Sequence, residues 1–136
     1  MAWDLRRQWE IWKSKDGINW MRIMKRGFSY PFNLSVWKLH VFQHKIIVGM
    51  QNQWFGCQIW ASKNNTPSKN DDFVKISKTG MKKWLQLNPF KLKQDGIKTF
   101  ETFDEKLYAG TASYMSILNS GTIIGPGCEI WRIDNI

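Results

Sequence analysis

Residues that could do chemistry are few in this sequence and stand far apart. His40 and His44 are four residues apart, a spacing that can hold a metal ion on a helix, but their segment has the pattern of a strand and its turn. Cys57 and Cys128 are too few for a thiolate zinc site or a disulfide framework. The sequence contains no phosphate-binding loop and no nucleophile elbow. We therefore predict no catalytic residue, no metal site and no cofactor.

Asp16 lies in a short polar segment, residues 14–20, and has two interpretations. As a turn residue, its carboxylate would accept hydrogen bonds from backbone N–H groups and cap a hairpin. As a catalytic acid, it would need a second carboxylate or a base beside it. We predict the structural role.

The net charge of +9, from 20 basic and 11 acidic residues, is unevenly distributed. Seven lysines lie between Lys75 and Lys98 with one acidic residue, Asp95, whereas acidic residues outnumber basic ones from Thr99 onward. A basic patch can bind phosphate groups, and a solvated loop surface is the alternative that we favour. The candidate lysines for a polyanion site are Lys75, Lys78, Lys82, Lys83, Lys91 and Lys93.

A repeated motif recurs along the chain. Residues 10–12, 56–60 and 127–131 each end in Ile-Trp preceded by Glu or Gln. Residues 42–50 align with residues 103–111, and residues 20–23 align with residues 73–76. The tryptophans of the motif, Trp12, Trp60 and Trp131, are unequally spaced, and insertions between the predicted strands account for the difference.

Each repeat unit is predicted to form four short strands in one antiparallel sheet, named a to d in chain order. A period near 48 residues with four strands per unit is that of a β-propeller blade. The predicted strands are 36–42 and 97–103 (a), 46–50 and 107–111 (b), 8–13, 57–61 and 128–133 (c), and 20–24 and 73–77 (d). We therefore predict an all-β fold, a β-propeller fragment with one complete and two partial four-stranded antiparallel blades.

The chain is predicted to be one propeller segment over residues 1–136. Residues 8–28 would form strands c and d of a partial blade, residues 36–80 a complete blade, and residues 97–136 strands a to c of the last blade. The insertions at residues 64–72 and 113–125 are expected to be exposed loops.

Face-to-face stacking of blades should bury both faces of the inner strands. Trp12, Trp60 and Trp131 recur at one blade position, so we predict that they pack between blades, with ligand stacking as the alternative.

Two further residue pairs recur at equivalent positions of neighbouring repeats. Cys57 and Cys128 are predicted to be small buried hydrophobes, too far apart for a disulfide. Gly49 and Gly110 are predicted to let neighbouring blades approach closely.

The repeat resembles that of β-propellers related to the sialidase and BNR-repeat superfamily, also called Asp-box proteins. Their repeats read Phe-x-x-x-Leu-Tyr-x-Gly-Thr and then Gly-x-Glu-Ile-Trp-Arg-Ser, and residues 14–20 resemble an Asp-box shortened by one residue. The resemblance implies a propeller fold and a structural role for Asp16. The Arg-Ile-Pro segment of the sialidases is absent. The matching residues are Phe103, Leu107, Tyr108, Gly110, Thr111, Gly127, Glu129, Ile130, Trp131 and Arg132.

The predicted strands leave the propeller incomplete, since a closed ring has about four to eight blades. In one interpretation the chain is the C-terminal part of a longer propeller, with Met1 an internal methionine, a truncated start or the product of a split gene. In the other, a short chain assembles a wheel from several copies. Both interpretations predict self-association or contact with the missing blades.

Three functions remain as hypotheses. The favoured one is a non-catalytic binding or scaffold propeller, with a glycan or a protein as its ligand. The second is part of a sialidase-like, glycan-active enzyme whose catalytic residues lie on absent blades. The third is a module that binds nucleic acid or another polyanion through Lys75 to Lys98. No apolar run is long enough for a membrane span, and the sequence assigns no compartment.

Overall fold

The structure is a computed structural model that describes residues 9–29, 33–52, 55–77, 81, 94, 96–112, 116–117, 123–124, 128–134 and 136. Antiparallel β-sheets dominate these residues, and two short 3-10 helices, η1 (Arg26–Ser29) and η2 (Asn70–Asp72), lie between strands. The prediction of an all-β fold with antiparallel sheets is thereby confirmed. No helix among the described residues is long and apolar enough to cross a membrane.

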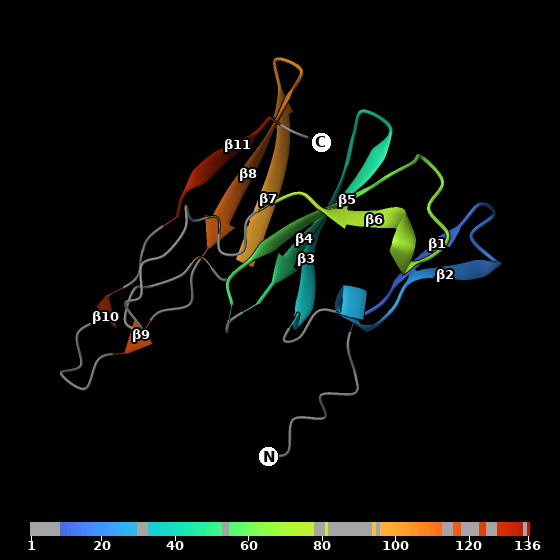
Figure 1. Ribbon diagram of the computed structural model, residues 1–136, viewed down its shortest axis with the longest axis horizontal. Coiled ribbons are helices and arrows are strands. Elements are labelled where there is room, and N and C mark those ends of the chain that lie inside the picture. The colour runs from blue at the N-terminus through green and yellow to red at the C-terminus, as the bar shows by residue number, and fades with distance from the viewer. Residues whose placement is uncertain are drawn as a thin grey trace.

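Three sheets follow one another across the molecule (Figure 1). The N-terminal sheet pairs β1 (Ile11–Ser14) with β2 (Trp20–Met24). The central sheet is the meander β3 (Ser35–Phe42), β4 (Lys45–Gln51), β5 (Gln58–Ser62) and β6 (Phe73–Lys75). The C-terminal sheet has the order β11 (Ile130–Ile133), β8 (Lys106–Ala112) and β7 (Gly96–Phe103). A separate small pair joins β9 (Ser116–Ile117) to β10 (Ile123–Ile124).

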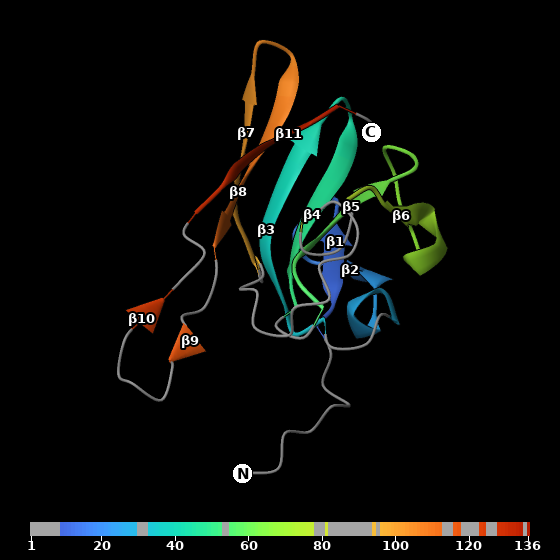
Figure 2. The same cartoon turned by 60° about the vertical axis from the view of Figure 1, so that its left-hand side comes forward.

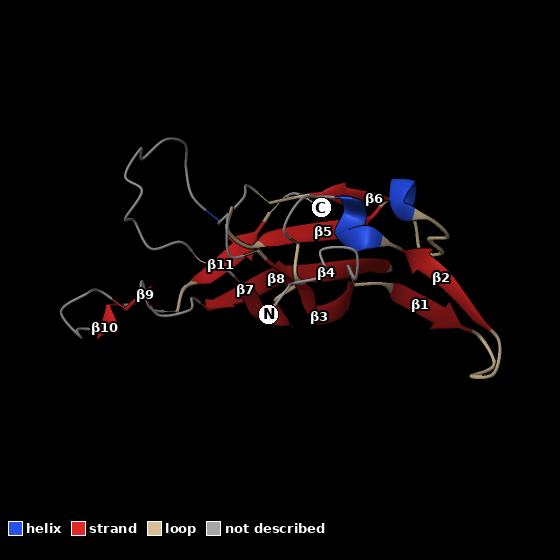
Figure 3. Cartoon of the chain, turned by 90° about the horizontal axis from the view of Figure 1, so that it is seen from below, coloured by secondary structure: helices blue, strands red, loops and turns tan. Residues whose placement is uncertain are grey.

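The central sheet lies between the other two, and its strands therefore bury side chains on both faces (Figure 3). On β4, Ile47 packs in the cluster shared with the C-terminal sheet, whereas Val48 and Met50 pack in the cluster shared with the N-terminal sheet. Successive residues of a strand point to opposite faces, so the apolar run of β4 is what a strand buried on both sides requires.

The first hairpins of the central and C-terminal sheets have the same geometry (Figure 2). Both turns have two residues with positive φ, Gln43-His44 and Asp104-Glu105, which is the two-residue turn that fits the twist of a hairpin. In both hairpins the register shifts near the start of the first strand, at Trp37 and at Lys98. The Lys98 ammonium lies 4.3 Å from the centre of the Trp37 ring, so the two irregular positions also meet across the interface.

Gly49 on β4 allows the central and C-terminal sheets to approach closely, as predicted. A Cβ at this position would lie 2.7 Å from the Cβ of Ile97 and 3.0 Å from the Phe100 ring, both on β7. The prediction is wrong for Gly110, because a Cβ there would meet Thr99, its partner on β7 within the same sheet. Gly110 therefore relieves crowding inside one sheet.

The predicted strand segments agree with the observed strands except at their ends. The predicted strand 73–77 is too long, since β6 ends at Lys75 and the N–H groups of Ile76 and Ser77 both donate to Ile59 O. Strand β11 begins at Ile130, two residues later than predicted. Residues 64–72 are mostly exposed as predicted, while most of the segment 113–125 lies outside the described residues.

Candidate functional site

The repeated Ile-Trp motif has the same local geometry in all three sheets. Each tryptophan donates its indole N–H to the side chain two residues before it. The distances from Nε1 to the acceptor oxygen are 3.0 Å for Trp12 with Glu10, 3.0 Å for Trp60 with Gln58, and 2.9 Å for Trp131 with Glu129. This repeated contact fixes the indole orientation and makes the three positions structurally equivalent.

The equivalent tryptophans all lie on the same side of their sheets. Trp60 on β5 packs toward the N-terminal sheet and stacks on Phe28, with ring centroids 4.3 Å apart. Trp131 on β11 packs toward the central sheet. Trp12 on β1 is 49% exposed, so the prediction that it packs between sheets is wrong within this chain. The reason is that no described sheet lies on that side of β1 and β2.

We name the outward side of the N-terminal sheet the N face. It presents Trp12, Trp20 and Arg22, which project to the same side of β1 and β2 in the observed register. Trp20 is 59% exposed, whereas Phe73, which occupies the aligned position on β6, is almost fully buried against the N-terminal sheet. Arg22 is paired within its own sheet, 2.7 Å from Glu10.

We name the outward side of the C-terminal sheet the C face. It presents Phe103, Tyr108, Ile130 and Arg132. Phe103 is 70% exposed and Ile130 is 81% exposed, whereas Phe42 and Ile59, at the aligned positions of the central sheet, are buried against the C-terminal sheet. Arg132 is paired within its own sheet, with its Nε 2.6 Å from Asp134. The pair raises the pKa of Arg132, first through that hydrogen bond.

The two cysteines differ for the same reason as the tryptophans. Both thiols are free; Cys57 is buried in the core between the central and C-terminal sheets, and Cys128 is exposed. The prediction that Cys128 is a buried hydrophobe is therefore wrong. Cys128 lies just before β11, on the sheet that has no described neighbour on its outward side.

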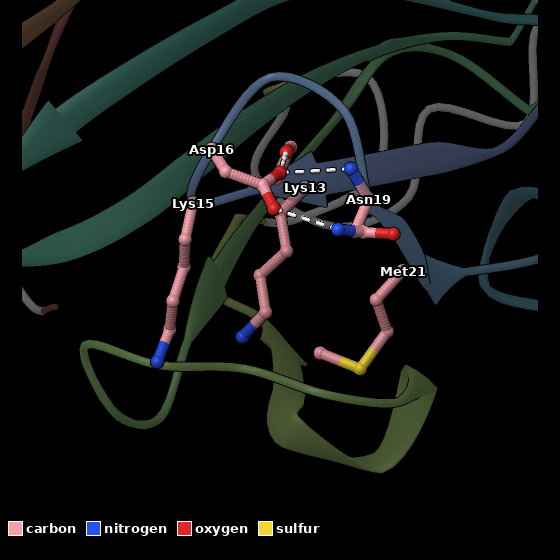
Figure 4. A pocket seen from close by; sticks show the side chains of 6 residues that line it. Lys13, Lys15, Asp16, Asn19 and Met21 are labelled. Atoms are coloured by element: carbon pink, nitrogen blue, oxygen red, sulfur yellow. Dashed lines mark hydrogen bonds between the residues drawn. The ribbon is translucent and has the colours of Figure 1, made fainter.

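Asp16 caps the hairpin between β1 and β2, in the geometry expected for its structural role (Figure 4). Its Oδ1 accepts the N–H groups of Ile18 and Asn19 at 2.9 and 2.8 Å, as well as the Ser14 hydroxyl. Its Oδ2 accepts the side-chain amide of Asn19 at 2.7 Å. These bonds, first of all the one from the Asn19 backbone, lower the pKa of Asp16 well below its usual value.

A shallow pocket of about 240 Å³ lies beside this hairpin. One of its lysines is engaged, because Lys13 Nζ donates to Pro67 O at 2.6 Å. Asn70 makes a second link, accepting from the Lys25 N–H and donating to the Lys25 carbonyl. The exposed segment 64–72 therefore ties the N-terminal sheet to the central sheet. The residues lining the pocket are Lys13, Ser14, Lys15, Asp16, Asn19 and Met21.

The basic region is described only at its ends. Lys75 is half-buried on β6, and Lys98 is exposed on β7 beside Trp37. These two lysines lie on different sheets. The other candidates, Lys78, Lys82, Lys83, Lys91 and Lys93, lie outside the described residues.

The histidines lie on a strand and its turn, as predicted. His40 Nε2 is 2.8 Å from the Thr102 hydroxyl across the interface with the C-terminal sheet. His44 is the second residue of the β3–β4 turn. Among the described residues, no group of His, Cys, Asp and Glu side chains could hold a metal ion.

Comparison of the chain with protein-family models, curated proteins and solved structures found no match.

Sequence reasoning predicts self-association or contact with missing blades, but it assigns no residues to the N and C faces. The alignment of the repeats contained the necessary signal, since Trp12 is the first Trp and Ile130 the last Ile of the motif series, and neither has a described sheet on its side.

Proposed function

We propose that this chain is a segment of a β-propeller that acts as a binding or scaffold module through its two open sheet faces. The observation that supports the proposal is the contrast in burial at equivalent positions. Ile59 is fully buried against the next sheet, while Ile130, one repeat later, is exposed. An isoleucine that is exposed where its equivalent is buried marks a surface suited to another sheet.

A protein surface fits these faces better than a glycan does. The exposed side chains are strand residues whose equivalents pack against aliphatic and aromatic groups of a neighbouring sheet. Arg22 and Arg132 are each paired with a carboxylate next to their own sheet, so covering the faces would leave neither guanidinium unpaired. Glu101, beside Tyr108 on the C face, accepts the Thr102 N–H and would need a polar partner from the covering surface. The Asp16 carboxylate accepts hydrogen bonds within its own turn, and we assign no catalytic role to it.

The test is binding of the apolar dye ANS by chain diluted until light scattering reports a monomer. We expect the chain to bind ANS and the variants Ile130→Ser and Trp20→Ser to bind less, with near-UV circular dichroism unchanged. Ile18→Ser is the matched control, because Ile18 is 81% exposed at the tip of the first hairpin and belongs to neither β1 nor β2. Equal ANS binding by all four proteins, or none, would count against the open faces as binding surfaces.

A further inference from the structure

The two open faces of this chain are the two halves of an interface that the chain forms twice internally. Each internal interface joins the side of one sheet that carries the Ile of the Ile-Trp motif to the side of the next sheet that carries the Trp. Ile11 faces Trp60 across the first interface, and Ile59 faces Trp131 across the second. The C face presents the next Ile, Ile130, and the N face presents the remaining Trp, Trp12.

We propose that the C face of one copy binds the N face of a second copy of this chain. The inference rests on the proposed function and adds the identity of the partner. Both halves are present in every copy, so the association is head-to-tail. Phe103 and Ile130 of one copy lie against Trp12 and Trp20 of the other, as Phe42 and Ile59 lie in the core of the second internal interface.

The number of sheets favours a closed pair of copies. In the part of each copy that the structure describes, three sheets stack in one direction beside the separate β9–β10 pair, and two copies would contribute six stacked sheets, within the range of about four to eight blades in closed propellers. Three copies would exceed that range. In a closed pair, each C face meets an N face, so both open faces of each copy are covered.

Part of the central sheet stays uncovered in this assembly and supplies a control. Leu39 and Val41 on β3 are exposed because the N-terminal sheet has only two described strands and does not reach them. Phe100, aligned with Leu39 on β7, is buried because the central sheet has four strands. Val41 is therefore an exposed strand residue that lies on neither the N face nor the C face.

The experiment is sedimentation velocity on the wild-type chain and on two variants, Trp12→Asp for the N face and Ile130→Asp for the C face. We expect a wild-type dimer, and at least a tenfold rise in the dissociation constant for each variant alone, about the effect of 1.4 kcal/mol. A mixture of the two variants should regain association, because the intact C face of one can bind the intact N face of the other. Ile18→Asp and Val41→Asp should dimerise like wild type.

Four results would overturn the proposal. Dimerisation of either variant alone with wild-type affinity would indicate a contact between like faces, and failure of the mixture to associate would exclude the head-to-tail contact. A wild-type monomer at all concentrations that still binds ANS at its faces would reject the second copy as partner while leaving the proposed function intact. A monomer without ANS binding would reject both. Trp20→Ser and Phe103→Ser repeat the test with milder changes if an aspartate variant fails to fold.

Discussion

Ile59 and Ile130 occupy the same position of the same repeated motif, and their surroundings are opposite. Ile59 on β5 is fully buried between the central and C-terminal sheets, and Ile130 on β11 is one of the most exposed apolar residues described. Their strands make equivalent contacts, since Ile59 pairs with Gly49 and Ile130 with Gly110. Each isoleucine is also followed by a tryptophan whose indole donates to the side chain before the isoleucine. The difference lies in whether a described sheet covers that side of the strand.

This contrast shows that each repeat carries side chains that pack against a neighbouring sheet, in addition to those that form its own strands. Burying an isoleucine side chain contributes roughly 1.5–3 kcal/mol to the free energy of unfolding. Ile59 makes this contribution at an internal interface, whereas the exposed Ile130 does not. Trp12 and Trp60 show the same contrast on the other side of the sheets. The N and C faces therefore carry the same kinds of side chain that form the interfaces between the described sheets.

The largest effect should come from the isoleucine pair. Ile59→Ala removes a fully buried side chain from the core between two sheets, and we expect a loss of about 2–5 kcal/mol in the free energy of unfolding by urea. Ile130→Ala should change it by less than about 0.5 kcal/mol at concentrations where the chain is monomeric. Equal losses for the two variants would contradict the assignment of one as core and the other as open face.

The glycine pair should give the next largest difference. Gly49→Ala places a Cβ against Ile97 and Phe100 of the neighbouring sheet, and overpacking of this kind costs about 1–3 kcal/mol. Gly110→Ala meets one atom, Thr99 Cγ2, instead of three atoms of Ile97 and Phe100, so its cost should be smaller. Thermal melts at matched concentration measure both. A larger loss for Gly110→Ala would place the tight approach within the sheet instead of between sheets.

The contact between Lys98 and Trp37 should have a smaller effect. Lys98→Met keeps the aliphatic stem and removes the charge over the Trp37 ring, so we expect a loss of about 0.5–1 kcal/mol in unfolding free energy. Lys106→Met is the control, because Lys106 forms an exposed ion pair with Asp104 at a hairpin tip. A loss for Lys106→Met as large as that for Lys98→Met would show that the ring contact adds nothing.

Asp16 should have the smallest and most local effect, visible in its pH dependence. Because its folded pKa is lowered, its hydrogen bonds stabilise the hairpin above the unfolded value of about 3.9 and are lost as pH falls through the folded value. The urea midpoint of wild type should therefore exceed that of Asp16→Asn at neutral pH, and the gap should close in acid. A gap that stays constant with pH would contradict a stabilising role of the charged carboxylate.

The all-β fold could be predicted because its signals are local. Turn residues and the apolar run of β4 located the central meander to within about two residues at most strand ends. The role of Asp16 could also be predicted, since a turn aspartate bonds backbone groups only a few residues away. These interactions depend on near neighbours in sequence.

The burial of the repeat positions could not be read from the motif itself. Trp12, Trp60 and Trp131 occupy the same position of the motif, and Cys57 and Cys128 each follow a glycine. The exposure nevertheless differs within each set. Burial depends on a neighbouring sheet that the motif does not contain. Gly110 was misassigned for a related reason, because its close contact lies on the paired strand of its own sheet.

Hydroxyl-radical footprinting of the wild-type chain, at dilute and at high concentration, tests the central claim most directly. We expect Trp12, Trp20, Phe103 and Ile130 to be reactive in dilute solution and to become protected together as concentration rises. Ile59 should be protected throughout, and Ile18 should be reactive throughout. If Trp12 and Ile130 stay as reactive as Ile18 at the highest concentration, the two open faces do not bind each other.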